Sequence, residues 1–196
     1  MKAKYPINEI FYSLQGEGFW SGRAAIFIRF SGCNLSCPFC DTNHKNGRIM
    51  TVGDIVEEIS KFPSRFIVFT GGEPSLFISE ELVVTLHDLG YFISIETNGT
   101  HKIKANIDWI TLSPKDAFVD NGKLVLTRCN ELKVIFTGKS PQPLYDSIKA
   151  DWRFIQPCDV NNIEENKRIA SEAVEWCKLH PDWRLSIQMH KLLDFR

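Results

Sequence analysis

Cys33-Asn34-Leu35-Ser36-Cys37-Pro38-Phe39-Cys40 places three thiols within eight residues, in the spacing C-x3-C-x2-C. Such spacing lets one loop wrap a compact inorganic core from one side. A [4Fe–4S] cluster normally takes four cysteine thiolates, yet the next cysteine along the chain is Cys129. Three ligands on four irons leave one iron open, whereas a structural zinc site is closed by four protein ligands. The loop therefore suggests chemistry at an open iron, and a zinc site or a disulfide loop is the alternative.

Composition sets the broad class of the protein. The chain has 196 residues, 43% hydrophobic and 24% charged, with a net charge of -1, which predicts one globular domain over residues 1–196. This charge implies no general attraction to nucleic acid or to membranes. The opening residues carry no apolar run, and no stretch is long enough for a transmembrane helix. We expect a cytoplasmic protein whose six cysteines are reduced thiols, metal ligands or core residues.

Apolar runs and capping signals predict an alternating series of strands and helices. Residues 7–20 are expected to form a strand or hairpin with a polar, glycine-rich tip. Thr51 and Asp54 make a capping-box pattern at the start of a helix, and Asn161 is expected to cap another. Further strands are predicted at 24–30, 65–69, 91–95, 107–112, 131–136, 153–155 and 185–188, and helices at 51–62, 79–89, 143–149 and 161–179.

This alternation favours an α/β fold with a parallel sheet and helices outside. Polar or glycine-rich clusters follow six of the strands, and in parallel barrels the chemistry lies at the carboxyl ends of the strands. A complete (β/α)8 barrel takes about 250 residues, and the links after the third and fourth strands look too short for long helices. We therefore predict an incomplete, open (β/α) barrel, whose open side would suit a homodimer.

Several residues carry two interpretations on the sequence alone. Arg29 interrupts an apolar strand and is either a surface ion-pair residue or an anion-binding residue near the cysteine loop. The segment 71–74, Gly-Gly-Glu-Pro, is either a strand-to-helix turn or a place where backbone approaches a ligand without an intervening Cβ. Cys129, Cys158 and Cys177 are widely spaced and are expected to be core thiols. His190 is the histidine expected at the mouth of the barrel.

The cysteine loop, with Phe39 before its last cysteine, resembles the cluster loop of the radical S-adenosylmethionine (SAM) superfamily. The Gly-Gly-Glu-Pro segment about 30 residues later resembles the second motif of that superfamily. The order of the segments narrows the resemblance to the 7-carboxy-7-deazaguanine synthase family. The segments that carry it are FYSLQGEG (11–18), RFSGCNL (29–35), CDT (40–42), TGGEP (70–74), ETNGT (96–100) and SPK (113–115).

This resemblance implies a [4Fe–4S] cluster, SAM and Mg2+ as cofactors, and ring contraction of 6-carboxy-5,6,7,8-tetrahydropterin with loss of ammonia. Cys33, Cys37 and Cys40 would bind the cluster and Thr42 the Mg2+. Arg29 would pair with the substrate carboxylate in a bidentate way. The other substrate contacts implied are Leu14, Gln15, Gly16, Thr70 and Arg196. The SAM contacts implied are Phe39, Cys40, Asp41, Gly72, Glu73, Glu96, Ser113, Pro114, Lys115, Gln156, Pro157, Cys158 and Asp159.

The resemblance also implies a flavodoxin or ferredoxin as electron donor and no direct nucleic-acid partner, although the product would serve queuosine or a related deazapurine. A glycyl-radical activating enzyme shares the cluster loop and is one alternative, and a non-catalytic iron–sulfur protein is another. The chain ends in Arg196, where family members often carry a different residue. We expect residues 189–196 to extend across the barrel mouth toward the substrate with the Arg196 side chain in solvent, the alternative being a frayed tail.

Overall fold

One continuous sheet organises the computed structural model, which describes residues 3–138 and 143–196. Within those residues the sheet has nine strands in the order β3-β1-β2-β4-β5-β6-β7-β8-β9. The strands are β1 (Tyr5–Leu14), β2 (Ala24–Phe30), β3 (Arg48–Met50), β4 (Phe66–Gly71), β5 (Phe92–Thr97), β6 (Trp109–Leu112), β7 (Arg128–Phe136), β8 (Lys149–Pro157) and β9 (Trp183–Leu185).

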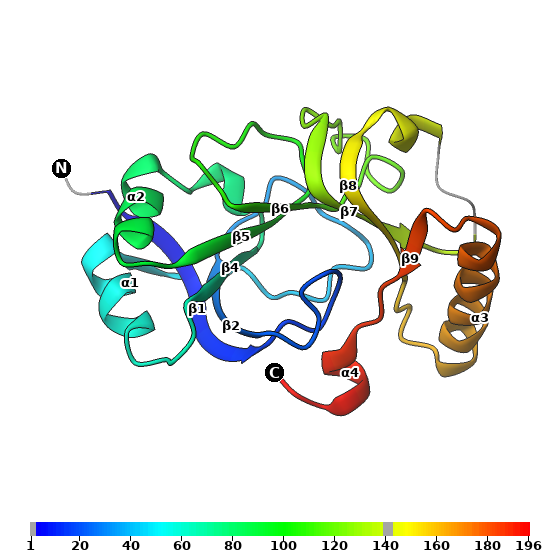
Figure 1. Ribbon diagram of the computed structural model, residues 1–196, viewed down its shortest axis with the longest axis horizontal. Coiled ribbons are helices and arrows are strands. Elements are labelled where there is room, and N and C mark those ends of the chain that lie inside the picture. The colour runs from blue at the N-terminus through cyan, green and yellow to red at the C-terminus, as the bar shows by residue number, and fades with distance from the viewer. Residues whose placement is uncertain (1–2, 139–142) are drawn as a thin grey trace.

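Strands β2 and β4 to β9 pair in parallel, and β1 pairs antiparallel with both β2 and β3. Figure 1 shows the sheet curving from β1 round to β9 without its two edges meeting. This arrangement confirms the predicted open barrel. The three-residue edge strand β3 was not predicted, because a stretch of three residues carries no periodic signal.

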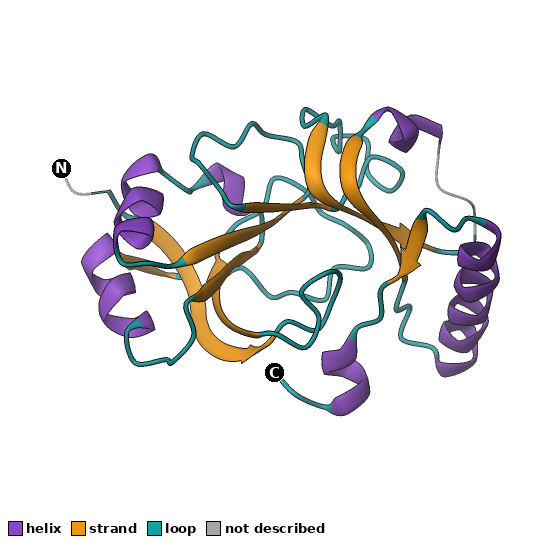
Figure 2. Cartoon of the chain, viewed as in Figure 1, coloured by secondary structure: helices purple, strands orange, loops and turns teal. Residues whose placement is uncertain are grey.

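The helices are α1 (Val52–Ile59), α2 (Glu80–Asp88), α3 (Ile163–Leu179) and α4 (Met189–Leu193), with the 3-10 turns η1 (Pro74–Leu76) and η2 (Pro143–Ser147). Three of the helices, α1, α2 and α3, lie on the outside of the curved sheet, and α4 lies on its open side near the C-terminus (Figure 2). Helices α1 and α2 share one hydrophobic core with β1, β2, β4 and β5, and α3 shares another with β7 and β8. The links β5–β6 and β6–β7 contain no helix, as their sequences predicted.

The sequence predicted the starts of α1 and α2 correctly, and it placed the cap of α3 one residue too early. Thr51 and Asp54 form the predicted capping box of α1, and Ser79 caps α2. The cap of α3 is Asn162, whose side chain accepts a hydrogen bond from the Glu165 amide at 3.0 Å, and not Asn161. Asn161 has φ 57°, in the left-handed region that asparagine tolerates, so the chain turns there before the helix begins.

The predictions for the C-terminal third need two further corrections. The last strand is Trp183–Leu185 rather than 185–188, because Ser186 leaves the sheet after its amide bonds the Ile155 carbonyl. The stretch predicted as a helix at 143–149 is the shorter 3-10 turn η2, and β8 already begins at Lys149. No helix among the described residues is long and apolar enough to cross a lipid bilayer.

The loop between β1 and β2 closes the amino-terminal end of the barrel. Phe19 stacks on Trp109 with ring centroids 4.8 Å apart, and Trp20 packs against Phe66, Phe92 and Trp109. Phe66, Phe92 and Trp109 are the first residues of β4, β5 and β6, so the aromatic rings fill the space at the start of these strands. The other end of the barrel, where the parallel strands finish, is left for a site.

Candidate active site

A cavity of about 730 Å³ lies at the carboxyl ends of the parallel strands. Every residue that the sequence placed in the site lines this cavity, with the exception of Pro114. The lining includes Leu14, Gln15, Gly16, Arg29, Cys33, Cys37, Phe39, Cys40, Asp41, Thr42, Thr70, Gly72, Glu73, Glu96, Ser113, Lys115, Gln156, Pro157, Cys158, Asp159 and Arg196. His190 also lines it, as predicted, and so does His44, for which the sequence offered no role.

The three cysteines of the loop contribute to one wall of the cavity. None is in a disulfide, Cys33 and Cys37 are partly buried, and Cys40 is exposed. Burial raises the pKa of the Cys33 thiol, and the neighbouring Cys37 and Cys40 act in the same direction. Three neighbouring thiols therefore disfavour one another's ionisation. A bound metal overcomes this effect, because a thiol that coordinates a metal is deprotonated. The donor set therefore fits an iron–sulfur cluster.

The alternative of a disulfide loop is not supported, because all six cysteines are free thiols. Cys129, far along the chain, is buried in the second core, as predicted for a core thiol. Cys158 is also buried but lines the cavity beside Asp159 and Lys191, and Cys177 is partly buried on α3.

The Gly-Gly-Glu-Pro segment lies directly against the start of the cysteine loop. A Cβ on Gly72 would lie 1.9 Å from the Gly32 carbonyl oxygen, and the Glu73 amide donates to that oxygen at 2.9 Å. The sequence left open whether this segment is a strand-to-helix turn or a place where backbone approaches a ligand; in the structure, Gly72 is required by this close approach of two backbones. Gly72 thereby fixes where the cysteine loop leaves β2.

Glu73, one of the SAM contacts that the resemblance implies, is held in place by hydrogen bonds from the protein itself. Its side chain is 1% exposed and already accepts hydrogen bonds from Thr97 Oγ1 at 2.6 Å and from the Asn98 amide at 2.7 Å. It also accepts from the Ser75 amide at 3.1 Å. This carboxylate ties the end of β4 to the end of β5, and this tie sets the floor of the cavity.

Arg29 projects into the cavity from β2 and has two partners. Its Nε donates to Glu9 Oε1 at 2.8 Å, and its Nη1 donates to Thr42 Oγ1 at 3.2 Å. Glu9 follows an irregularity in the β1–β2 pairing and also pairs with the Arg196 side chain. Arg29 is therefore held from behind by a carboxylate, while the remainder of its guanidinium faces the cavity.

The C-terminal segment returns to the site as a short helix, α4, rather than as the extended chain that was predicted. The Met189 amide donates to the Gly16 carbonyl at 3.0 Å, and a Cβ on Gly16 would lie 2.6 Å from His190 Nδ1. Arg196 accepts a hydrogen bond from Ser13 through its backbone carbonyl, and its side chain lies over Phe11. The tail is thus docked in this structure, and the Arg196 side chain pairs with Glu9 at the surface while remaining 67% exposed to solvent, as expected.

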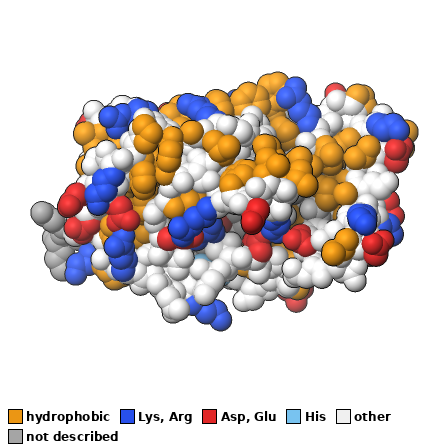
Figure 3. Space-filling model, turned by 90° about the horizontal axis from the view of Figure 1, so that it is seen from below, with side chains coloured by type: hydrophobic (Ala, Val, Ile, Leu, Met, Phe, Trp, Pro, Cys, Tyr) orange, Lys and Arg blue, Asp and Glu red, His pale blue; other side chains and the backbone are white. Residues whose placement is uncertain are grey.

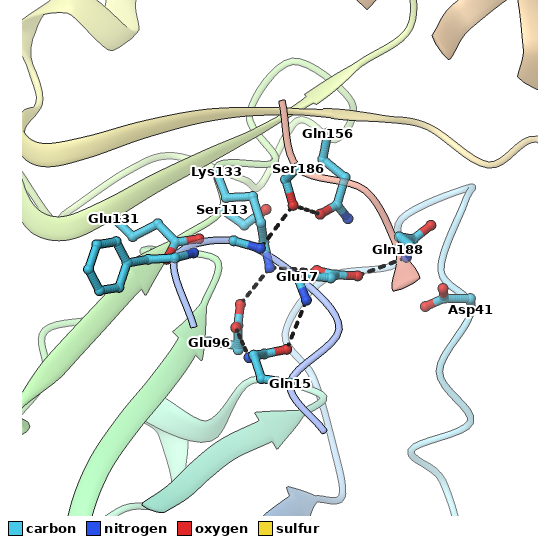
Figure 4. A network of polar contacts seen from close by, with 12 residues as sticks. Gln15, Glu17, Asp41, Glu96, Ser113, Glu131, Lys133, Gln156, Ser186 and Gln188 are labelled. Atoms are coloured by element: carbon cyan, nitrogen blue, oxygen red, sulfur yellow. Dashed lines mark hydrogen bonds and ion pairs between the residues drawn. The ribbon is translucent and has the colours of Figure 1, made fainter. Parts of the chain in front are cut away.

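A buried cluster of charges occupies the wall between the β1–β2 loop and β7 (Figure 4). Lys133 Nζ donates to Glu17 Oε2 at 2.6 Å and to Glu96 Oε2 at 2.9 Å. Burial alone would raise the pKa of Glu17, but the Lys133 ammonium lowers it to about 2. Burial would likewise lower the pKa of Lys133, and the carboxylates of Glu17, Glu96 and Glu131 hold it above its usual range instead.

Sequence reasoning missed Glu9, Glu17, Lys133 and Gln188 as lining residues. One signal was available for Lys133, because alternation along β7 points residues 131, 133 and 135 away from the helix-facing Leu132, Val134 and Phe136. A lysine at an inward position of a buried strand requires a counter-charge. Glu9 and Gln188 offered no such signal, since their partners lie 20 and 171 residues away in the chain.

Comparison with known proteins shows the class of protein to which this fold and site belong. The family model described as "Radical SAM superfamily" matches residues 27–149, a region that includes the cysteine loop and the Gly-Gly-Glu-Pro segment. An open parallel barrel with a three-cysteine loop at its mouth is the fold and site of a radical SAM enzyme. The cofactors of this class are a [4Fe–4S] cluster and SAM, and the free thiols and the cavity described above fit them.

Curated relatives narrow the class further. The chain is 48% identical over 190 residues to the 7-carboxy-7-deazaguanine synthase of Bacteroides thetaiotaomicron, covering 97% of this chain and 98% of the relative. It is 41% identical to the enzyme of that name from Burkholderia multivorans, covering 97% and 98%. The crystal structure of QueE from Escherichia coli has a TM-score of 0.75 at 28% identity, covering 95% of both chains. The chain belongs to the 7-carboxy-7-deazaguanine synthase family.

Iron binding by variants distinguishes the cysteines of the loop, which are expected to bind the cluster, from Cys129 in the core. We expect Cys37→Ala to lose the visible absorbance and iron content of the reconstituted protein, because two thiolates cannot replace three at one cluster. Cys129→Ala, a change of similar size in the hydrophobic core, should keep both near wild type. Iron and sulfide analysis of the two variants makes the comparison. Equal loss in both would show that the C-x3-C-x2-C loop is not the sole source of cluster ligands.

Glu9 provides a test of how Arg29 is held. Glu9→Ala leaves Arg29 without its ion-pair partner, and a partly exposed pair contributes up to about 1 kcal/mol. The KM for a carboxylate-bearing substrate should therefore rise several-fold while SAM cleavage in its absence is unchanged. Glu58→Ala breaks the Arg48 ion pair away from the cavity and is the matched control. An unchanged KM in Glu9→Ala would remove Glu9 from the positioning of Arg29.

Proposed function

We propose that this protein converts 6-carboxy-5,6,7,8-tetrahydropterin to 7-carboxy-7-deazaguanine by a radical ring contraction with loss of ammonia, a step toward queuosine and related deazapurines. The observation that carries this proposal is that a cluster loop and an arginine-bearing wall face one cavity, in a chain that matches named synthases over nearly its full length. A glycyl-radical activating enzyme or an electron carrier would not require that wall.

Cys33, Cys37 and Cys40 would hold the cluster, which together with SAM would supply the radical chemistry. The protein's own task would be to hold SAM and the substrate next to each other in the cavity.

For SAM we propose the lining segments at the strand ends, with Phe39 and Asp41 beside the cluster, Glu73 on the floor and Ser113 and Lys115 beyond it. Glu96, which the resemblance implied as a SAM contact, is instead bonded to Gln15 and Lys133 and is proposed to face the substrate. Pro114 lies outside the lining and is proposed to shape the turn. Residues 156–159 complete the set after β8.

The substrate is proposed to lie between SAM and the β1–β2 loop. Arg29 would pair with its carboxylate, since the guanidinium is held in place by Glu9 and presents its remaining donors to the cavity. The pterin edge would meet Thr70 and the backbone of residues 14–16. Arg196 is proposed to close this side, and its contacts with Ser13 and Glu9 support a docked position.

Thr42 is proposed as the protein ligand of a Mg2+ ion that also takes oxygens from the substrate, since Mg2+ is often held by few protein ligands plus substrate and water. In the structure Thr42 Oγ1 accepts from Arg29 at 3.2 Å and approaches Asp41 Oδ1 at 3.5 Å. Both contacts are long enough to rearrange around an ion. The hydroxyl therefore lies between the residue proposed for the carboxylate and the cluster loop.

We further propose one radical SAM domain over residues 1–196, a homodimer, a flavodoxin or ferredoxin as reductant, and a cytoplasmic setting, where thiols stay reduced. The strands outside residues 27–149 join the same sheet as those within, which supports the single domain. Figure 3 shows a band of hydrophobic side chains across one face, with basic and acidic side chains interspersed. Such a band supports association between copies.

Turnover by the reconstituted protein tests this function. With dithionite, SAM and the carboxytetrahydropterin under anaerobic conditions, we expect mass analysis to find 7-carboxy-7-deazaguanine and ammonia in equal amounts. Protein without reconstituted iron is the control and should form neither. Release of 5′-deoxyadenosine without any change in the pterin would place the chain in the superfamily but reject this substrate.

The docked tail gives a second test. Deleting Phe195 and Arg196 removes the contacts with Ser13, Glu9 and Phe11, so the KM for the pterin should rise about tenfold while SAM binding is kept. Arg196→Ala should have a smaller effect, because its exposed ion pair contributes little and the backbone contact survives. Unchanged pterin kinetics in the truncated enzyme would mean that the docked tail has no part in the site.

A further inference from the structure

Lys133 is the most deeply buried cation of the cavity wall that the proposed mechanism leaves without a role. Its side chain is 6% exposed, and β7 places it on the barrel interior between Glu131 and Ile135. Its two ion-pair partners come from distant parts of the chain, Glu17 from the β1–β2 loop and Glu96 from the end of β5. All three side chains line the cavity.

The partners of Lys133 are themselves fixed on their far sides. Gln15 Nε2 donates to Glu96 Oε1 at 3.1 Å, and Gln188 Nε2 donates to Glu17 Oε1 at 2.9 Å. Each carboxylate therefore has one oxygen on the lysine and one on an amide, as Figure 4 shows. Carboxylate oxygens accept more than one hydrogen bond, so both retain capacity toward the cavity.

We propose that Lys133 is a positioning residue that holds the Glu17 and Glu96 carboxylates side by side, ionised, as an acceptor pair for the donor edge of the substrate's aminopyrimidinone ring. This inference rests on the proposed function. An aminopyrimidinone presents an amino group and a ring N–H next to each other, and two neighbouring acceptors complement that edge. Two buried carboxylates without a cation between them would instead disfavour each other's ionisation.

Other charged groups face this cluster from every element packed against it. Glu131 lies on β7 itself and accepts from the Phe19 amide at 3.1 Å, and burial raises its pKa to about 7. Lys115 follows β6, where burial lowers its pKa to about 8, and His190 faces Glu17 from α4. Lys115, Glu131 and His190 all remain when Lys133 is changed, and the Lys133 ammonium also lowers the pKa of Glu131 and of Lys115, so the ratio of variant to wild type reports the response of the whole cluster to the lysine.

Lys133→Met removes the ammonium and keeps the length of the side chain. Without it, only the Gln188 hydrogen bond and His190 oppose the burial of Glu17, so its pKa rises and its carboxyl keeps a proton at low pH. The acceptor is then lost at low pH and regained as the pH rises. We expect the ratio of dissociation constants, variant over wild type, to be at least tenfold at pH 6 and to fall steadily toward pH 9.

The measurement is equilibrium dialysis of 7-carboxy-7-deazaguanine, which carries the same ring edge, across that pH range, with SAM binding measured in parallel. Lys167→Met, which changes an exposed lysine of α3, is the control and should leave both constants unchanged. SAM binding should stay near wild type in Lys133→Met. A ratio that does not vary with pH, or binding of the product at the wild-type strength, overturns the proposal.

A double variant keeps the test decisive if Lys133→Met fails to fold. Glu17→Gln combined with Lys133→Met leaves Glu96 as the one carboxylate of the acceptor pair, with Glu131 unchanged on β7, so the repulsion between the paired carboxylates is gone and the protein should fold. It should bind the product more weakly than wild type by a factor that is constant with pH. A double variant that does not fold shows that Lys133 holds the barrel rather than the acceptors. Failure of wild type to bind or form the product rejects the proposed function instead.

Discussion

A buried ammonium group must have counter-charges, and the wall of this site is arranged to supply them to Lys133. Removing one partner of a buried ion pair costs about 3–5 kcal/mol, so the structure is strongly constrained to bring Glu17 and Glu96 to the same point. Glu17 can reach it only if the β1–β2 loop enters the barrel, and Gln188 follows only if the chain leaves the sheet after β9. One cation thereby gathers three segments around the cavity.

The β1–β2 loop also closes the amino-terminal end of this short barrel. Its residues 15–17 line the cavity, while Phe19 and Trp20 pack under the first residues of β4, β5 and β6. A complete barrel would fill this space with side chains from additional strands. Here a hairpin loop of nine residues between β1 and β2 supplies both the aromatic base and part of the polar wall, and an antiparallel β1 supports it. The sheet is therefore free to stay open at β3 and β9.

Sequence patterns predicted the strands and most of the caps, and nearly all of the site residues they proposed do line the cavity, because each of these depends on neighbours in the chain. Thr51 and Asp54 are three residues apart, and the polar clusters follow their own strands directly. Asn161 and Asn162 are the same residue type side by side, so only backbone conformation decides which one caps α3. The course of α4 and the pairing of Glu9 with Arg29 depend on contacts across the fold, and no local pattern encodes those.

The residues of the site fall into two groups, those within the segment that matches the superfamily model and those outside it. The cysteine loop and the segment at Gly72 lie within residues 27–149, which match the superfamily as a whole, and they are fixed by backbone contacts such as Glu73 to Gly32. Glu9, Glu17 and Gln188 lie outside that range and are held by side-chain ion pairs and hydrogen bonds. The cluster loop is thus held within the central segment by a backbone contact that requires glycine at position 72, whereas the amino-terminal part of the chain is tied to that segment at Lys133 and Arg29 through side chains.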